Sequence, residues 1–292
     1  MEMVIAIAAG VVVLFIIAVY VLSVYYNKQL VTEVYFLGGE TGKTQQLPIK
    51  IIFLSDIHDS LFGKRLEFLL ETLEREKPDL ILIGGDVVVR KKFRPDRSLE
   101  LLRKIARYGQ VYYANGNHEM KLALAMPEEM AQYDRKLEEY GVHRLVNESA
   151  AVCINGITVR ITGLDLPEQF YRKLKKPDEL TKEKLEELVG EKKEDYTILL
   201  AHHPRYFQAY AEWGANLVLS GHIHGGIIRL PKLGGVLSPD LSLFPKCSGG
   251  MYQKKDSVLI VSRGVGVHSI PFRLFNKPEL SIILKTDNEA PL

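Results

Sequence analysis

Apolar positions along the chain fall into continuous runs and into stripes with helical spacing. The runs at residues 49–54, 80–83 and 197–201 are typical of strands that are buried on both faces. Between the first two runs, leucines recur at i, i+3, i+4 and i+7 over residues 66–73, which predicts an amphipathic helix that ends before Pro78. Strand, loop and helix then repeat in this order. The pattern therefore predicts an α/β fold.

The remaining pattern extends this alternation as far as residue 219. Residues 167–193 are highly charged, and we expect them to be mostly helical and solvated. No internal repeat, low-complexity segment or linker divides the region that follows the amino terminus. Further strands are expected at residues 31–37, 110–114, 142–145, 150–154, 157–163 and 216–219, and further helices at residues 99–105 and 127–140.

The amino-terminal run over residues 3–26 contains no charged side chain. A helix of about 20 residues crosses the hydrocarbon core of a bilayer, and the tyrosines near the end of this run suit the interface. A cleaved signal peptide is the alternative, but no Lys or Arg precedes the run and no small-x-small site follows it. We therefore expect a single-pass anchor over residues 1–27 in the cell membrane. Lys28 weakly favours a cytoplasmic domain, and the side of the membrane stays open.

Composition excludes some partners. The 292 residues are 47% hydrophobic and 25% charged, and 38 Lys and Arg against 36 acids leave a net charge of only +2. We therefore expect no nucleic-acid partner, while nothing in the sequence sets the oligomeric state. Cys153 and Cys247 are far apart and show no CxxC spacing, which favours two buried thiols. Their pairing stays open if the domain lies outside the cytoplasm.

The motif at residues 220–226, SGHIHGG, follows the apolar run at residues 216–219. Because a strand sends alternate side chains to one face, His222 and His224 are expected to point together, and the glycines allow a tight turn beside an ion. Alone, a polar strand end without a metal explains the motif nearly as well.

Other candidate ligands also follow predicted strands. Six of the 8 histidines lie in such segments, together with two aspartates and an asparagine. Ligands collect beyond the carboxyl ends of strands in open α/β sheets, so these side chains are expected to converge. Taken singly, each has a turn, cap or polar-surface explanation; in combination we favour a metal site. The set is Asp56, His58, Asp86, Asn117, His118, His202, His203, His222 and His224.

The ordered motifs Asp56-x-His58, Gly85-Asp86, Gly116-Asn117-His118-Glu119, His202 and Gly221-His222-x-His224 resemble those of the calcineurin-like metallophosphoesterases, from about Ile49 to Ile283. The resemblance implies a four-layer α/β/β/α sandwich of two mixed sheets with flanking helices over residues 28–292, following the anchor. Residues 221–231, 234–245 and 261–275 further resemble a bacterial membrane-associated branch. That branch is similar to enzymes that split UDP-diacylglucosamine.

The resemblance also implies residue roles. One ion would be held by Asp56, His58 and His224, the other by Asn117, His202 and His222, and Asp86 would bridge both. Nitrogen and oxygen donors without thiolate suit manganese, iron, zinc or cobalt, and manganese is favoured for the two divalent ions. A hydroxide shared between the ions would attack phosphorus, and His118 would stabilise or protonate the leaving oxygen.

Several positions stay open or depart from the family pattern. His203, Arg229, Arg263 and Arg273 are candidate substrate contacts, although a solvated or structural arginine is the more common case. No acid follows Asp86 within residues 87–90, where many relatives carry one. Val89 stands where purple acid phosphatases have a tyrosine ligand, so we expect no iron(III)-tyrosinate colour.

The resulting hypothesis is metal-dependent hydrolysis of a phosphodiester or pyrophosphate bond. The anchor favours a lipid-linked or nucleotide-sugar phosphate near the membrane. Two alternatives stay open: an anchored phosphodiesterase that acts on soluble nucleotides, and a non-catalytic, membrane-anchored interaction module on the same fold. A nuclease is a weaker possibility because no basic cluster or stacking platform stands out.

Overall fold

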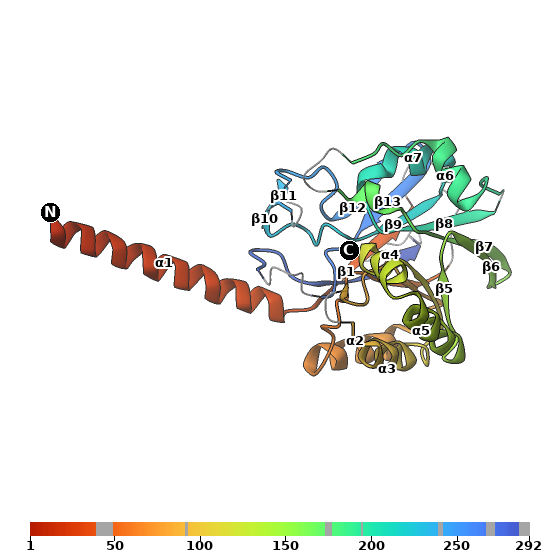
Figure 1. Cartoon of the computed structure of the whole chain (residues 1–292), viewed down its shortest axis with the longest axis horizontal. Coiled ribbons are helices and arrows are strands. Elements are labelled where there is room, and N and C mark those ends of the chain that lie inside the picture. The colour runs from red at the N-terminus through yellow and green to blue at the C-terminus, as the bar shows by residue number, and fades with distance from the viewer. Residues whose placement is uncertain are drawn as a thin grey trace.

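Two six-stranded sheets lie face to face, with helices on both outer faces (Figure 1). The computed structural model describes residues 1–38, 49–90, 93–172, 177–193, 195–238, 242–266 and 272–285. Parts of the predicted 167–193, 234–245 and 261–275 segments lie outside these residues. The four-layer α/β/β/α sandwich that the sequence predicts is confirmed.

The first sheet has the strand order β1-β14-β2-β3-β4-β5. Strands β2 to β5 run parallel, whereas β14 is antiparallel to β2 and parallel to β1, so the sheet is mixed. Its strands are β1 (Val31–Leu37), β2 (Ile51–Leu54), β3 (Leu80–Ile83), β4 (Gln110–Ala114), β5 (Val142–Leu145) and β14 (Glu279–Lys285).

The second sheet has the order β12-β13-β9-β8-β7-β6, with antiparallel pairs only at its two edges. A small hairpin, β10 (Ile228–Leu230) and β11 (Gly234–Leu237), stands apart from both sheets. The sheet consists of β6 (Glu148–Ile154), β7 (Ile157–Leu164), β8 (Tyr196–Ala201), β9 (Leu217–Ser220), β12 (Gly250–Lys254) and β13 (Ser257–Val261).

Burial on both faces explains the continuous apolar runs. In β2, Ile51 and Phe53 pack between the sheets, whereas Ile52 and Leu54 pack under the helices. The helices α2 (Lys64–Glu76), α3 (Pro95–Ile105) and α5 (Pro127–Glu139) cover the first sheet, and α6 (Lys182–Val189) and α7 (Phe207–Trp213) cover the second (Figure 1). Three apolar layers result, and the central one lies between the sheets.

Helix α1 (Glu2–Lys28) projects from the sandwich, and its apolar stretch is not buried against the rest of the chain (Figure 1). Among the described helices it is the one that is long and apolar enough to cross a membrane. A signal sequence near an amino terminus meets the same criteria of length and composition. Most of α1 is exposed, but Ser23, near its end, is buried against the domain.

Three local predictions need correction. In the described part of residues 167–193, about half of the residues are helical, in the short 3-10 helix η2 (Glu168–Tyr171) and in α6, which Thr181 caps at its start. This part is not fully solvated, because Phe170 and Tyr171 are buried. The short helices α4 (Asn117–Ala125) and α7 were not predicted. Finally, the two cysteines are free thiols that are not buried: Cys153 is exposed on the edge strand β6, and Cys247 is half-buried.

Candidate metal centre

The candidate ligands lie just beyond the ends of five strands, where the carboxyl ends of parallel strands from both sheets meet. Asp56 and His58 follow β2, Asp86 follows β3, and His202 follows β8. Several of these residues adopt the left-handed backbone region that side chains rarely occupy, as at Asp86 (φ 55°). Such strain is concentrated at functional sites. The remaining candidates are Asn117 and His118 after β4, and His222 and His224 after β9.

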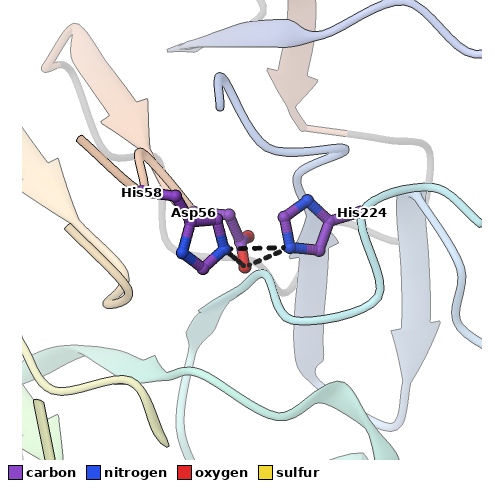
Figure 2. A group of neighbouring side chains, drawn as sticks. All are labelled: Asp56, His58 and His224. Carbon is purple, nitrogen blue, oxygen red and sulfur yellow. Dashed lines mark hydrogen bonds and ion pairs between the residues drawn. The ribbon is translucent and has the colours of Figure 1, made fainter. Parts of the chain in front are cut away.

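Asp56, His58 and His224 form a first group of converging donors. The Nε2 atom of His224 lies 3.2 Å from Asp56 Oδ1 and 3.2 Å from His58 Nε2, and His58 Nε2 lies 4.0 Å from the same Asp56 oxygen (Figure 2). All three side chains are buried. Two imidazoles and a carboxylate facing one point form a donor set that suits a transition-metal ion.

Asp86, His202 and His222 form a second group, with donor atoms within 4.8 Å of one another. His202 Nε2 lies 3.3 Å from Asp86 Oδ2, and the rings of His202 and His222 meet edge to face at 5.1 Å. Asp86 Oδ2 is also 3.9 Å from His58 Nε2 in the first group. Asp86 therefore lies between the two groups, as a carboxylate shared by two ions would.

Asn117 provides an independent test of whether the residues fit a metal. Its Oδ1 atom is buried and has no hydrogen-bond partner among the described residues. A buried carbonyl oxygen without a partner costs roughly 1–3 kcal/mol, so such atoms are rare unless a ligand satisfies them. Because Asn117 begins α4 directly beside Asp86, a cation in the second group would supply the missing partner.

His118 lies at the same centre with a defined proton arrangement. Its Nδ1 atom accepts a hydrogen bond of 3.0 Å from the backbone N–H of Arg90, and its ring meets His58 edge to face at 5.0 Å. Since Nδ1 accepts, the neutral ring carries its proton on Nε2. The backbone N–H of His118 donates to Asp86 Oδ1 at 2.8 Å, which ties the start of α4 to the shared carboxylate.

The electrostatics of the second group favour a bound proton when no cation is present. Burial tends to lower the pKa of His202, but the charges of Asp86 and Asp56, together with hydrogen bonds to Asp86 and to the Gly84 carbonyl, outweigh it and raise this pKa to about 10. Burial opposes ionisation of Asp86, yet the charges of His202 and His118 hold its pKa well below the usual range. In the first group, burial raises the pKa of Asp56 to about 6. A metal ion would replace the proton on His202, because a coordinating imidazole must be neutral.

Glu119 organises the loop after β3 and was not assigned a role from sequence. It is fully buried and accepts hydrogen bonds from the backbone N–H groups of Asp86 and the next two residues, from Gly116 N–H, and from the Tyr113 hydroxyl. The spacing from Gly116 to Glu119 is that of a capping box, which is the sequence signal for it.

Gly221 allows the loop after β9 to approach Asp56. A Cβ atom at this position would lie 1.9 Å from Ser55 Oγ and 2.2 Å from Asp56 Oδ2, which no side chain can tolerate. The close approach lets the backbone N–H of His222 donate to both carboxylate oxygens of Asp56 at 3.1 Å.

His203 is buried at the edge of the second group, and its ring lies 4.3 Å from the ring of His222. The ring of Tyr171 from η2 stacks on His203 at 5.6 Å and meets His222 edge to face. Burial raises the pKa of Tyr171 well above its usual range, so the phenol stays protonated at neutral pH. Sequence reasoning missed Tyr171 because the segment was expected to be a solvated helix.

The three candidate arginines all make protein contacts. Arg263 forms ion pairs of 2.7 Å with Glu33 and Glu279. Arg229 donates to the carbonyl oxygens of residues 225 and 249 and to the Ser248 hydroxyl. Arg273 is buried, and its guanidinium donates to backbone carbonyls beside His224.

Residues 49–226, which contain all the candidate ligands, match the sequence profile of the family described as calcineurin-like phosphoesterase. The chain belongs to this family. This phosphoesterase is 31% identical to a metallophosphoesterase of Aquifex aeolicus (strain VF5), over 86% of this chain and 92% of that one. It is 26% identical to phosphodiesterase YaeI of Escherichia coli (strain K12), over 82% and 83% of the two chains.

Among solved structures, the phosphoesterase is similar to the phosphopantetheinyl hydrolase PptH of Mycobacterium tuberculosis, with a TM-score of 0.48 and 15% identity over 83% of this chain and 98% of that one. Family membership makes the protein a metal-dependent hydrolase of phosphoric esters. The family uses a dimetal centre, and the two groups of donors described above are the residues available for one.

Proposed function

We propose that this phosphoesterase hydrolyses a phosphodiester or pyrophosphate bond at a centre of two divalent cations. The observation that carries the proposal is the pair of donor groups that meet at Asp86, together with the unpartnered oxygen of Asn117. A fold that serves only as an interaction module has no need for this arrangement. Its buried histidines and carboxylates are costly to maintain without bound cations.

Each ion has a proposed ligand set. Asp56, His58 and His224 hold the first; Asp86 contacts both; and the second is held by Asn117, His202 and His222. Manganese is the first candidate, followed by iron, zinc and cobalt. When bound, the two cations supply water activation and neutralise the charge of the phosphoryl group.

His118 is the proposed catalytic side chain. The hydrogen bond from Arg90 N–H to its Nδ1 atom leaves the ring proton on Nε2. The Nε2–H group can donate a hydrogen bond to the oxygen that leaves phosphorus and stabilise the negative charge that develops on it as the phosphoester bond breaks, while water supplies the proton that this oxygen finally takes up. The ring contact with His58 keeps the imidazole at the centre.

The proposed substrate is a lipid-linked or nucleotide-sugar phosphate at a membrane surface. Residues 1–27 would anchor the protein in the cell membrane through residues 3–26, and residues 28–292 would form the phosphoesterase domain. The exposed, apolar α1 supports this location. The resemblance of residues 221–231 and 234–245 to the membrane-associated branch supports the substrate class.

The test uses the full chain in detergent micelles with added Mn²⁺. Hydrolysis of bis(p-nitrophenyl) phosphate, a nucleotide sugar and a glycolipid diphosphate is compared for the wild type, His222→Ala and the control His143→Ala, whose exposed ring stacks only on Tyr112 among the described rings. We expect His222→Ala to lose at least about a hundredfold in rate, in line with the loss of a ligand or its support. The control should keep wild-type activity.

Equal rates for the wild type and His222→Ala would refute the two-metal mechanism, and no hydrolysis of any ester would favour the interaction module. If only the lipid-free nucleotides react, the lipid part of the proposal fails and an anchored nucleotide phosphodiesterase replaces it.

A further inference from the structure

The end of α1 is packed against the loop that carries Arg273. Ser23 is only 1% exposed, and its hydroxyl accepts a hydrogen bond of 3.0 Å from the backbone N–H of Arg273. One turn later, the ring of Tyr26 meets the ring of Phe275 edge to face at 5.6 Å. The rest of α1 projects away from the domain (Figure 1). The last turns of this helix are therefore part of the folded domain.

The same loop reaches the first group of candidate ligands from the other side. The buried guanidinium of Arg273 donates to the carbonyl oxygen of Gly266 at 2.9 Å and to that of His224 at 3.4 Å, and it lies 3.4 Å from Nδ1 of the His224 ring. Asn276 donates from Nδ2 to the His224 carbonyl at 2.7 Å. Residues 273–276 thus connect α1 directly to His224.

His224 depends on this support because its backbone is strained. It has a φ of 53°, in the left-handed region, and the next two residues are glycines with φ of 73° and 91°. A left-handed conformation is unfavourable for a non-glycine residue, and glycines add no local stiffness. The conformation persists where surrounding contacts fix it, and the described contacts to the His224 carbonyl come from Arg273 and Asn276.

We propose that Ser23 and Arg273 are positioning residues for the ion held by Asp56, His58 and His224. The seating of the last turns of α1 fixes the Arg273 loop, which in turn holds His224 at the distance that the ion requires. This inference rests on the two-metal centre proposed above. It also assigns Arg273 a supporting role in place of a substrate contact, because its donors are directed at backbone carbonyls inside the protein. The amino-terminal helix is then a component of the metal centre as well as an anchor.

The experiment measures metal retention by the full chain in detergent micelles. Co²⁺-loaded wild type, Ser23→Ala and Arg273→Lys are exposed to graded EDTA, and the cobalt left per chain is measured by mass spectrometry while the visible absorption spectrum reports the ligand geometry. Tyr20→Ala is the matched control, since Tyr20 lies on the same helix but is 64% exposed. Ser23→Thr restores the hydroxyl.

We expect the wild type to hold two ions. Ser23→Ala and Arg273→Lys should release one of them at roughly tenfold lower EDTA, the usual effect of removing a residue that orients a ligand, and keep the other at wild-type affinity. Tyr20→Ala and Ser23→Thr should match the wild type.

Unchanged retention in both variants would overturn the inference, and so would parallel loss of both ions, which indicates general destabilisation. A wild type that holds fewer than two ions refutes the two-metal centre itself. The number of ions bound to the wild type is measured before the variants are compared, so a failure of the two-metal centre can be told apart from a failure of this inference.

Discussion

Replacing Glu119 by glutamine tests whether this buried carboxylate holds the metal loop together. Its Oε1 atom accepts from the backbone N–H groups of Val87 (2.8 Å) and Val88 (3.1 Å) and from the Tyr113 hydroxyl (2.7 Å). Its Oε2 atom accepts from Asp86 N–H (2.8 Å) and Gly116 N–H (2.9 Å). A glutamine amide must place an NH₂ group at one of these two oxygen positions. Because an NH₂ group cannot accept a hydrogen bond, the bonds made at that position are lost.

The least damaging orientation puts the NH₂ group in place of Oε2 and loses two hydrogen bonds. A hydrogen bond to a charged acceptor contributes about 1.5–3 kcal/mol, so Glu119→Gln should reduce the free energy of unfolding by about 3–6 kcal/mol. This is a large part of the total stability of a typical domain, about 5–15 kcal/mol. The loss also frees the backbone of Asp86, so metal affinity should fall with stability.

The free energies of unfolding of the wild type and Glu119→Gln are compared by urea unfolding of the full chain in detergent micelles, monitored by far-ultraviolet circular dichroism. Tyr113→Phe removes a single bond to the same carboxylate and should cost about 1.5–3 kcal/mol, which keeps the test decisive if the glutamine variant does not fold. Glu139→Gln, at an exposed pair with Lys136, is the control and should leave the midpoint unchanged. A loss below about 1 kcal/mol in Glu119→Gln would refute the reasoning.

Three further outcomes are expected. Burial raises the pKa of Asp165 to about 6, above the ordinary aspartate value of about 3.9. The folded state therefore binds this proton more tightly than the unfolded state, and stability falls as pH rises from about 4 through 6. Asp165→Asn should remove this slope and its cost, at most about 3 kcal/mol, in melts at pH 4, 5, 6 and 7. Gly221→Ala should lose both activity and bound metal, because its Cβ overlaps Ser55 and Asp56. Asn117→Leu should lose metal yet raise the melting temperature of the metal-free protein, because it removes an unpartnered buried oxygen; a lower melting temperature contradicts this.

The fold was readable from sequence because its signals are local and periodic. The apolar runs of β2, β3 and β8 are buried on both faces, as predicted, and the leucine stripe of α2 packs on the first sheet. Parallel strands bring their carboxyl ends to one edge, so residues as distant as Asp56 and His224 were expected to converge, and they do. The assignment of each ligand to one ion stays a prediction.

Features set by distant contacts were not readable in the same way. The partners of Glu119 at the loop after β3 lie more than 30 positions earlier, and no local pattern marks them. Tyr171 lies in the short helix η2, where it and Phe170 are buried, and its ring stacks on that of His203. The many charged residues of this segment gave no sign of that burial. Cys153 is hydrophobic by type, yet it lies on the outward side of an edge strand.

His222 and His224 show most directly the difference between what local periodicity predicts and what distant contacts determine. Strand alternation predicted that both rings point to one face, but β9 ends at Ser220, and the two histidines have φ of 68° and 53° in the turn beyond it, where a period of two no longer applies. The N–H of His222 is fixed by Asp56, 166 positions earlier, whereas the carbonyl of His224 is fixed by Asn276, 52 positions later. Different parts of the chain hold the two residues, and their rings lie in separate donor groups. The spacing of this motif therefore identifies the site, and the contacts around it determine which group each histidine joins.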